Sequence, residues 1–196
     1  MNETRLRVVL AGGGTGGHVY PALAISEIAQ RHLGPMELLF IGVEGRAEAH
    51  IVPHHGIPIR YVKSRGLSLH PVGATLFTAT LAQGFGTALS YLREFDPHLL
   101  VSTGGYSSAP AVLAAATLRA RKGRPRIVIH EQNALPGRAN RMASRLADRV
   151  MTTFESSGRF FPLARVVHTG YPVRSAITCV DREQARARHG IEPGAR

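Results

Sequence analysis

The chain has 196 residues, with 44% hydrophobic side chains, a single cysteine, no tryptophan and a formal net charge of +11. The lone Cys179 excludes a disulfide framework and a cysteine-rich metal cluster, and it indicates a reducing compartment. No stretch approaches the roughly 18 uninterrupted apolar residues of a membrane span, so we expect a globular domain without a transmembrane helix.

The positive charge comes almost entirely from arginine and is concentrated in one part of the chain. Residues 119–149 contain nine Lys or Arg residues against only Glu131 and Asp148. Such a segment attracts polyanions, which makes nucleic acid, an anionic membrane surface and a phosphorylated substrate the candidate partners. An arginine-rich coding bias would give the same composition without any function. No nucleic-acid-binding signature accompanies the charge, so we expect no nucleic acid partner.

The first elements of the chain are a strand, a glycine-rich turn and a helix. Residues 6–11 are rich in β-branched side chains, as suits a strand buried on both faces. Residues 12–17 contain five glycines, and residues 19–29 carry apolar side chains at helical spacing, with Pro21 in the tolerated first turn. This arrangement presents bare backbone N–H groups at a helix N-terminus to an anion, usually a phosphate.

Two familiar phosphate-binding motifs do not fit this turn. Three of the glycines satisfy GxGxxG, but the dinucleotide fingerprint also needs an acidic residue at the end of the second strand. That strand, residues 36–42, ends in glycine, and Glu44 follows too late. A P-loop needs Lys after the last glycine, where this chain has His18. We therefore expect another phosphate ligand, and the alternative is a turn that only packs the helix on the sheet.

The middle of the chain continues the alternation and contains one long uncharged stretch. We expect a helix at residues 46–54, a strand at 57–62 and a helix at 72–95 that is interrupted by Gly84 and Gly86. Residues 66–91 contain no Asp, Glu, Lys or Arg. We expect burial for most of this stretch. The alternative is a partly exposed apolar face that docks on a membrane surface, with Lys63 and Arg65 nearby.

A second strand–turn–helix unit repeats the first. It comprises a strand at residues 98–102, a glycine turn at 103–110 and an Ala-rich helix at 111–121. Two such turns after parallel strands lie at the same carboxyl edge of a sheet, where ligands of α/β proteins bind. We therefore expect a phosphate site built from both turns, with two packing turns as the alternative.

The last third of the chain adds polar residues at the same edge. Its predicted elements are strands at 126–130, 149–152 and 164–169, and helices at 136–146 and 181–189. The first of these strands delivers His130, Glu131, Gln132 and Asn133, a poor choice for packing and a good one for polar recognition. The repeated alternation of strand and helix predicts an α/β fold with a doubly wound, parallel, Rossmann-like sheet.

Four segments together resemble a known family: GGTGGHVYPALA, STGGYSSAPAVLAA, HEQNALPGRANR and GYPVR. Over residues 6–174 the chain resembles the N-terminal half of the bacterial peptidoglycan N-acetylglucosaminyltransferases. These enzymes move GlcNAc from UDP-GlcNAc to the undecaprenyl-diphosphate-linked muramyl-pentapeptide, lipid I, and so form lipid II.

The resemblance implies a GT-B glycosyltransferase architecture, of which this chain holds the N-terminal half, and an inverting transfer without a metal or another cofactor. Residues 1–174 are then the acceptor-binding Rossmann-like domain. Residues 175–196 are the hinge and the start of a donor-binding domain, the rest of which is missing from this chain. The chain is then a fragment, a truncated gene product or one subunit of a split enzyme. In each case we expect the isolated chain to be inactive without a donor-binding domain. The implied position is peripheral, on the anionic cytoplasmic face of the plasma membrane.

The family's functional residues map onto the glycine turns and the strand ends. The implied donor contacts are Thr15, Gly16, Gly17, Asn133 and Arg174. The implied contacts to the acceptor diphosphate are Gly13, Gly14, Gly104, Gly105, Tyr106 and Ser107, with Ser108 nearby. His18 is the implied general base, because the transfer deprotonates the acceptor hydroxyl and imidazole titrates in the right range. A structural imidazole that caps the turn is the alternative. His130 and Glu131 are expected to shape the site rather than to catalyse.

Two other functions remain open from the sequence. One is another lipid glycosyltransferase of the same superfamily, such as a diacylglycerol glycosyltransferase, which differs in the acceptor. The other is a non-enzymatic module that binds phosphate or nucleic acid. Salt-sensitive, sequence-blind RNA binding without a response to sugar nucleotides would favour the module.

Overall fold

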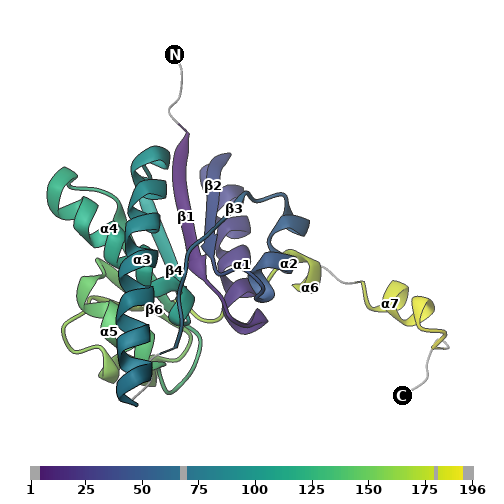
Figure 1. Cartoon of the computed structure of the whole chain (residues 1–196). Helices are drawn as coiled ribbons and strands as arrows, with labels where there is room; N and C mark the ends of the chain where they lie inside the picture. The colour runs from purple at the N-terminus through teal and green to yellow at the C-terminus, as the bar shows by residue number, and fades with distance from the viewer. Residues whose placement is uncertain (1–4, 67–69, 179–180, 192–196) are drawn as a thin grey trace.

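The computed structural model describes residues 5–66, 70–178 and 181–191, and within them it contains one seven-stranded, wholly parallel sheet (Figure 1). The sheet order is β3-β2-β1-β4-β5-β6-β7. The strands are β1 (Leu6–Gly12), β2 (Met36–Gly42), β3 (Ile59–Tyr61), β4 (Leu99–Gly104), β5 (Arg126–Glu131), β6 (Arg149–Thr152) and β7 (Val166–His168). The order reverses between β1 and β4, which confirms the predicted doubly wound Rossmann-like fold.

Helices cover both faces of this sheet (Figure 1). The α-helices are α1 (Gly16–Leu33), α2 (Ala47–Ile51), α3 (Pro71–Phe95), α4 (Ala109–Lys122), α5 (Arg138–Ala143), α6 (Ser175–Thr178) and α7 (Arg182–Arg188). Short 3₁₀ helices are η1 (Pro53–His55), η2 (Tyr106–Ser108), η3 (Ser144–Leu146) and η4 (Glu155–Phe160).

The alternation of side chains along β1 divides the core into two layers. Val9 and Ala11 pack in one apolar cluster with residues of α3 and α4. Val8 and Leu10 pack in a second cluster with residues of α1. Both faces of the central strands are therefore buried, which explains their continuous apolar runs. Burying each large apolar side chain contributes about 1.5–3 kcal/mol to folding.

The structure moves the start of the first helix into the glycine run. We expected a turn through Gly17, but α1 begins at Gly16 after Thr15, whose backbone is extended. The first N–H groups of a helix have no acceptor within the helix, so those of Gly16 and Gly17 are open to a ligand. The N-terminus of α1 therefore lies inside the predicted phosphate turn.

Several predicted elements are shorter or divided. The helix expected at residues 46–54 is α2 followed by η1, and the helix expected at 136–146 is α5 followed by η3. The strands expected at 57–62 and 164–169 shrink to β3 and β7, both at edges of the sheet. Three short elements, η2, η4 and α6, were not predicted.

Helix α3 differs from the prediction in two respects. It runs without interruption through Gly84 and Gly86. The expected burial is wrong for its first half, because none of residues 73–83 is buried and Leu76 is 47% exposed. Residues 67–69 of the uncharged stretch lie outside the described part of the chain. Despite its apolar character, neither α3 nor any other helix among the described residues is long and apolar enough to cross a membrane.

Candidate functional site

The two glycine turns meet at the carboxyl edge of the sheet, because β1 and β4 are neighbours and Gly12 pairs with Gly104. The turns are in direct contact: a Cβ on Gly105 would lie 2.5 Å from the Gly13 carbonyl oxygen. Gly104 and Gly105 also have φ values of +95° and +80°, which side chains rarely adopt. Glycine is therefore required where one turn closes on the other.

His18 joins the two turns through a reciprocal pair of hydrogen bonds. Its Nδ1 lies 2.9 Å from the Thr103 carbonyl oxygen, and the Thr103 hydroxyl donates to the His18 carbonyl oxygen at 2.6 Å. A carbonyl oxygen only accepts, so Nδ1 carries the hydrogen. In the neutral ring, Nε2 then keeps its lone pair. This is the tautomer that a general base requires, held in place by the second turn.

The second turn leads through η2 into α4 and supplies several of the predicted contacts. The Ser108 hydroxyl donates to the Gly105 carbonyl oxygen at 2.9 Å, and the Tyr106 carbonyl oxygen accepts from Ser64 at 2.7 Å. The Ser107 hydroxyl is buried and has no hydrogen-bond partner among the described residues. The Ser107 side chain is 0% exposed, so in this arrangement its hydroxyl is not open to a ligand. The Tyr106 ring faces Gly14 of the first turn, 3.7 Å from where a Cβ would lie.

Glu131 is a buried carboxylate that is fully engaged within the protein. Its oxygens accept from the Asn133 N–H and Nδ2, from the Gly137 N–H and from Asn140 Nδ2, at 2.9–3.2 Å. Asn140 in turn lies against Gly104, where a Cβ would be 2.8 Å from Asn140 Oδ1. Glu131 therefore shapes the loop after β5 and supports the second turn from behind.

His130 is buried and neutral. Burial lowers the pKa of His130 below its usual range. The hydrogen bond to the Gly170 carbonyl oxygen and the charge of Glu131 raise the pKa, but burial has the larger effect. Its Nε2 lies 3.2 Å from that carbonyl oxygen, and Gln132 Nε2 donates to the Thr103 carbonyl oxygen at 3.0 Å. The end of β5 is thus tied to the second turn on one side and to Gly170 on the other.

Asn133 and Arg174 lie farther out on the same rim. Asn133 is exposed, and with its Nδ2 donated to Glu131, its Oδ1 has no hydrogen bond among the described residues. The Arg174 guanidinium stacks on the Tyr20 ring at 4.1 Å, and that ring lies beside Gly16. Ser175 follows, and its hydroxyl donates to Glu27 of α1. The segment after β7 is therefore held along α1, from Tyr20 near the start of that helix to Glu27 in its second half.

One residue of the site was missed by the sequence reading. Glu48 of α2 has a fully buried side chain whose oxygens accept the Gly14 N–H at 2.8 Å and the Val43 N–H at 3.0 Å. The available signal was weak: an acidic residue in a short helix that packs on the first turn. The predicted diphosphate contact of Gly14 cannot use its N–H group, because Glu48 already holds it.

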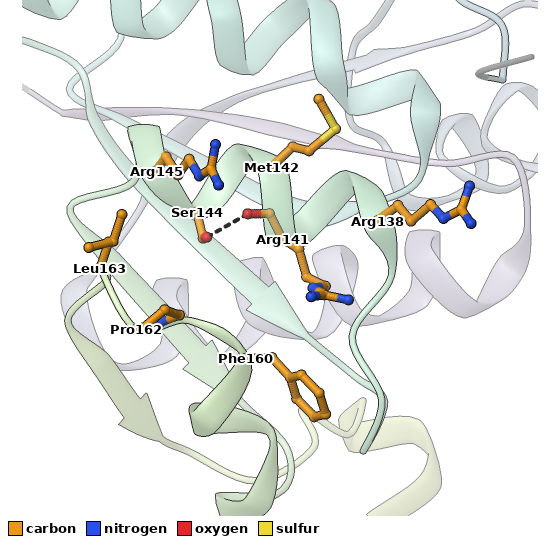
Figure 2. A pocket seen from close by; sticks show the side chains of 8 residues that line it. All are labelled: Arg138, Arg141, Met142, Ser144, Arg145, Phe160, Pro162 and Leu163. Carbon is orange, nitrogen blue, oxygen red and sulfur yellow. Dashed lines mark hydrogen bonds between the residues drawn. The ribbon is translucent and has the colours of Figure 1, made fainter. Parts of the chain in front are cut away.

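A separate cavity of about 360 Å³ lies between α5, η3 and the segment after η4 (Figure 2). Its lining is Arg138, Arg141, Met142, Ser144, Arg145, Phe160, Pro162 and Leu163. Among the described residues, no carboxylate pairs with the three arginines, whereas two apolar lining residues are 68% and 81% exposed (Met142 and Leu163, respectively). We call this the arginine cavity. The described residues contain no group of three His, Cys, Asp or Glu side chains that could hold a metal ion.

Comparisons with known proteins identify the family of this chain. A family model described as "Glycosyltransferase family 28 N-terminal domain" matches residues 8–152. A UDP-N-acetylglucosamine--N-acetylmuramyl-(pentapeptide) pyrophosphoryl-undecaprenol N-acetylglucosamine transferase of Desulforudis audaxviator is 47% identical, over 95% of this chain and 49% of the relative. The protein of the same name from Moorella thermoacetica is 41% identical, over 96% and 50%. The chain thus spans about half the length of the curated relatives it matches.

Solved structures show the same partial coverage. The crystal structure of Acinetobacter baumannii MurG matches with a TM-score of 0.70 and 27% identity, over 86% of this chain and 46% of that chain. A UDP-N-acetylglucosamine 2-epimerase from Rickettsia bellii matches with a TM-score of 0.58 and 13% identity, over 96% of this chain and 52% of that chain, which shows the fold alone.

Proposed function

Because this chain belongs to the glycosyltransferase family 28 N-terminal domains, we propose that it is the acceptor-binding half of a UDP-GlcNAc-dependent hexosyltransferase. The reaction is transfer of GlcNAc to lipid I, which forms lipid II for peptidoglycan. Residues 1–174 form the acceptor domain in this proposal. Residues 175–196 lead into a donor-binding domain, which accords with coverage of about half of each relative.

The observation that carries the proposal is the contact of the two glycine turns through His18. With Nδ1–H donated to the Thr103 carbonyl oxygen, neutral His18 offers Nε2 as a base beside both turns. In the proposed step, Nε2 takes the proton of the acceptor hydroxyl while the oxygen of that hydroxyl attacks the anomeric carbon of the donor sugar. The bond from that carbon to the UDP oxygen breaks, and UDP leaves with the electron pair.

The two turns divide the ligands between them in this proposal. Gly104, Gly105, Tyr106 and Ser107 bind the acceptor diphosphate. Gly13 and Gly14 border it from the first turn. The N-terminus of α1, with Thr15, Gly16 and Gly17, stabilises charge on the donor, because helix N-termini attract anions. Asn133 and Arg174 complete the donor contacts on the rim.

We place the protein peripherally on the cytoplasmic face of the plasma membrane. The exposed first half of α3 offers apolar side chains, and the arginine cavity offers positive charge that no carboxylate of the described residues pairs with. Both belong to one layer of the molecule, because α3 packs on α4 and the α5–η3 segment packs in the same apolar cluster. Apolar and basic groups together are typical of interfacial binding to anionic lipid.

The test is transfer of radiolabelled GlcNAc from UDP-GlcNAc to a short-chain lipid I analogue. We expect no transfer by the chain alone and transfer when the C-terminal half of a matching relative is supplied in trans. His18→Asn is the informative variant, because the Asn amide can keep the hydrogen bond to Thr103 while it lacks the Nε2 base. We expect its rate to fall by about 10²–10⁴-fold, and we expect the loss of transfer toward low pH, where a general base is protonated, to disappear.

His50→Asn, at an exposed position of α2, is the matched control and should retain full transfer. A His18→Asn enzyme with the pH profile of the wild type would make His18 structural. Absence of transfer when both halves are folded and associated would reject the peptidoglycan acceptor and favour another lipid acceptor.

A further inference from the structure

We propose that Glu48 is a positioning residue that holds the first glycine turn from behind and reserves the diphosphate of the ligand for the second turn and the N-terminus of α1. This inference rests on the proposed function, because it concerns how the acceptor and donor phosphates are distributed. Glu48 touches no proposed ligand and acts through the backbone of the turn.

The Glu48 carboxylate bridges two chain segments that are far apart in the sequence. One oxygen accepts from Gly14 in the turn after β1, at 2.8 Å, and the other accepts from Val43 after β2, at 3.0 Å. The side chain is 0% exposed. Hydrogen bonds to an ionised acceptor are stronger than those between neutral groups, and losing one from a buried group is costly. These two hydrogen bonds therefore fix the position of the first turn relative to the sheet.

Two glycines make room for this carboxylate. A Cβ on Gly13 would coincide with the Glu48 carboxyl group, and a Cβ on Gly42 would lie 2.6 Å from Glu48 Cγ. These glycines are therefore explained by a protein side chain rather than by a ligand. The first turn resembles a phosphate loop in sequence, yet part of its inner surface is already filled by an anion of the protein itself.

The position of the first turn is transmitted to the catalytic region by direct contact. The Gly13 carbonyl oxygen meets Gly105, and Gly14 meets the Tyr106 ring. Both partners belong to the second turn, which also fixes the His18 tautomer through Thr103. A shift of Gly13 and Gly14 would therefore move the groups that we assign to the acceptor diphosphate.

Charge points to the same division of roles. A carboxylate beneath Gly14 repels a second anion at that N–H group, and the repulsion is strong where water is excluded. Two residues later the N-terminus of α1 carries the positive end of an 18-residue helix dipole, with the N–H groups of Gly16 and Gly17 unpaired in the helix. The ligand phosphates are thus excluded from Gly14 and attracted on either side of it.

The test uses Glu48→Gln in the full chain, with farnesyl diphosphate as the acceptor probe. The amide oxygen of Gln can accept only one of the two N–H groups, and its NH₂ group faces the other donor. We expect the affinity for the probe to fall at least about tenfold and hydrogen exchange at Gly14 to accelerate by a similar factor. Glu44→Gln, a change at an exposed position in the loop between β2 and α2, should alter neither measurement.

A second measurement needs no variant. When farnesyl diphosphate or UDP is added to the wild-type chain, the amide resonances of Gly16, Gly17, Gly104 and Gly105 should shift more than that of Gly14. The largest shift at Gly14 would overturn the proposal, and so would unchanged affinity of Glu48→Gln. If the wild type binds neither probe, the proposed function fails, while exchange at Gly14 still reports whether Glu48 holds the turn.

Discussion

At the scale of single residues, His130 connects the chemistry of the site to the stability of the fold. It is buried at the end of β5, with one ring nitrogen near the Gly170 carbonyl oxygen and the other 3.4 Å from Gln132 Nε2. The ring therefore acts as a neutral crosslink between the loop after β5 and the segment after β7. A charged imidazolium would have to be accommodated in the same buried space.

We expect the stability of the protein to fall as the pH drops below about 6.5, the usual pKa of histidine. The pKa of His130 is lower in the folded state, so the unfolded chain binds more protons in that range and the free energy of unfolding decreases. His130→Gln keeps a donor for Gly170 but does not titrate. Thermal unfolding between pH 7.5 and 5.5 should show a smaller loss for this variant.

His50→Gln on the exposed surface is the control and should follow the wild type. Equal losses of thermal stability for the wild type and His130→Gln would show that His130 does not contribute to the pH dependence.

Sequence alone could predict which side chains gather at the carboxyl edge but not which of them are already engaged. The positions of the glycine turns and of the strand ends are enough to predict which side chains lie together, because parallel strands end at the same edge of the sheet. The roles of Glu48 and Glu131 depend on hydrogen bonds to the Gly14 and Gly137 backbone. The residues that such hydrogen bonds join are not separated by a fixed number of residues, so no local sequence pattern predicts them.

At the scale of elements, α3 shows two glycines in different environments. Gly84 is buried, and a Cβ there would collide with the Lys63 carbonyl oxygen and lie 3.1 Å from Pro110 Cγ. Gly86 is exposed and has open space around it. One glycine lets the helix approach its neighbours, and the other only loosens the helix.

We therefore expect opposite effects from two substitutions in the same turn of α3. Gly86→Ala should raise the free energy of unfolding by about 0.5–1 kcal/mol, because alanine restricts the unfolded chain and favours the helix. Gly84→Ala should lower it by about 1–3 kcal/mol through overpacking. Chemical denaturation of the two variants beside the wild type measures both. Effects of the same sign would contradict the packing described for Gly84.

The predictions of secondary structure were wrong mainly at the ends of elements and in short segments. The long strands β1, β2 and β4 were located from their apolar runs, because burial on both faces leaves a continuous signal. The division of residues 136–146 into α5 and η3 left no such signal. The first half of α3 was misjudged because an uncharged composition is shared by buried helices and by surfaces that meet another apolar phase.

At the scale of the whole molecule, the net charge of +11 acts together with the exposed apolar residues. Arg141 and Arg145 of the arginine cavity are free of carboxylate partners within the described residues, and the Arg141 guanidinium lies 5.6 Å from the centre of the Phe160 ring. In the proposed membrane association, this positive charge, which no carboxylate of the described residues neutralises, would bind lipid phosphates. The apolar side chains of α3, such as Leu76, would add burial once the surface is reached.

We expect Arg141→Glu/Arg145→Glu to weaken binding to phosphatidylglycerol-containing vesicles by at least about tenfold, since each basic residue near an anionic surface contributes about 1 kcal/mol. Leu76→Glu should weaken it as well, through the loss of apolar insertion. Vesicle sedimentation at two salt concentrations measures both effects, and wild-type binding should fall as salt is raised.

Arg5→Glu, at the amino end of β1 and so at the opposite edge of the sheet, is the control for net charge alone. Arg141→Glu alone is measured beside it, so that each variant reverses one charge. If Arg5→Glu weakened binding as much as Arg141→Glu alone, the attraction would be a general effect of charge and the proposed surface would be rejected.

The packing of Gly13, Gly42 and Glu48 has a consequence for how such a chain can change over generations. No one of the three can be replaced freely, since a side chain at either glycine meets the carboxylate and loss of the carboxylate leaves the Gly14 and Val43 N–H groups unpaired. Mutational drift would therefore have to pass through a less fit intermediate or alter several positions together. The three residues, which lie in the first two strand–helix repeats, are therefore expected to be inherited together. A designer who transfers the glycine turn to another sheet would also have to transfer the distant glutamate.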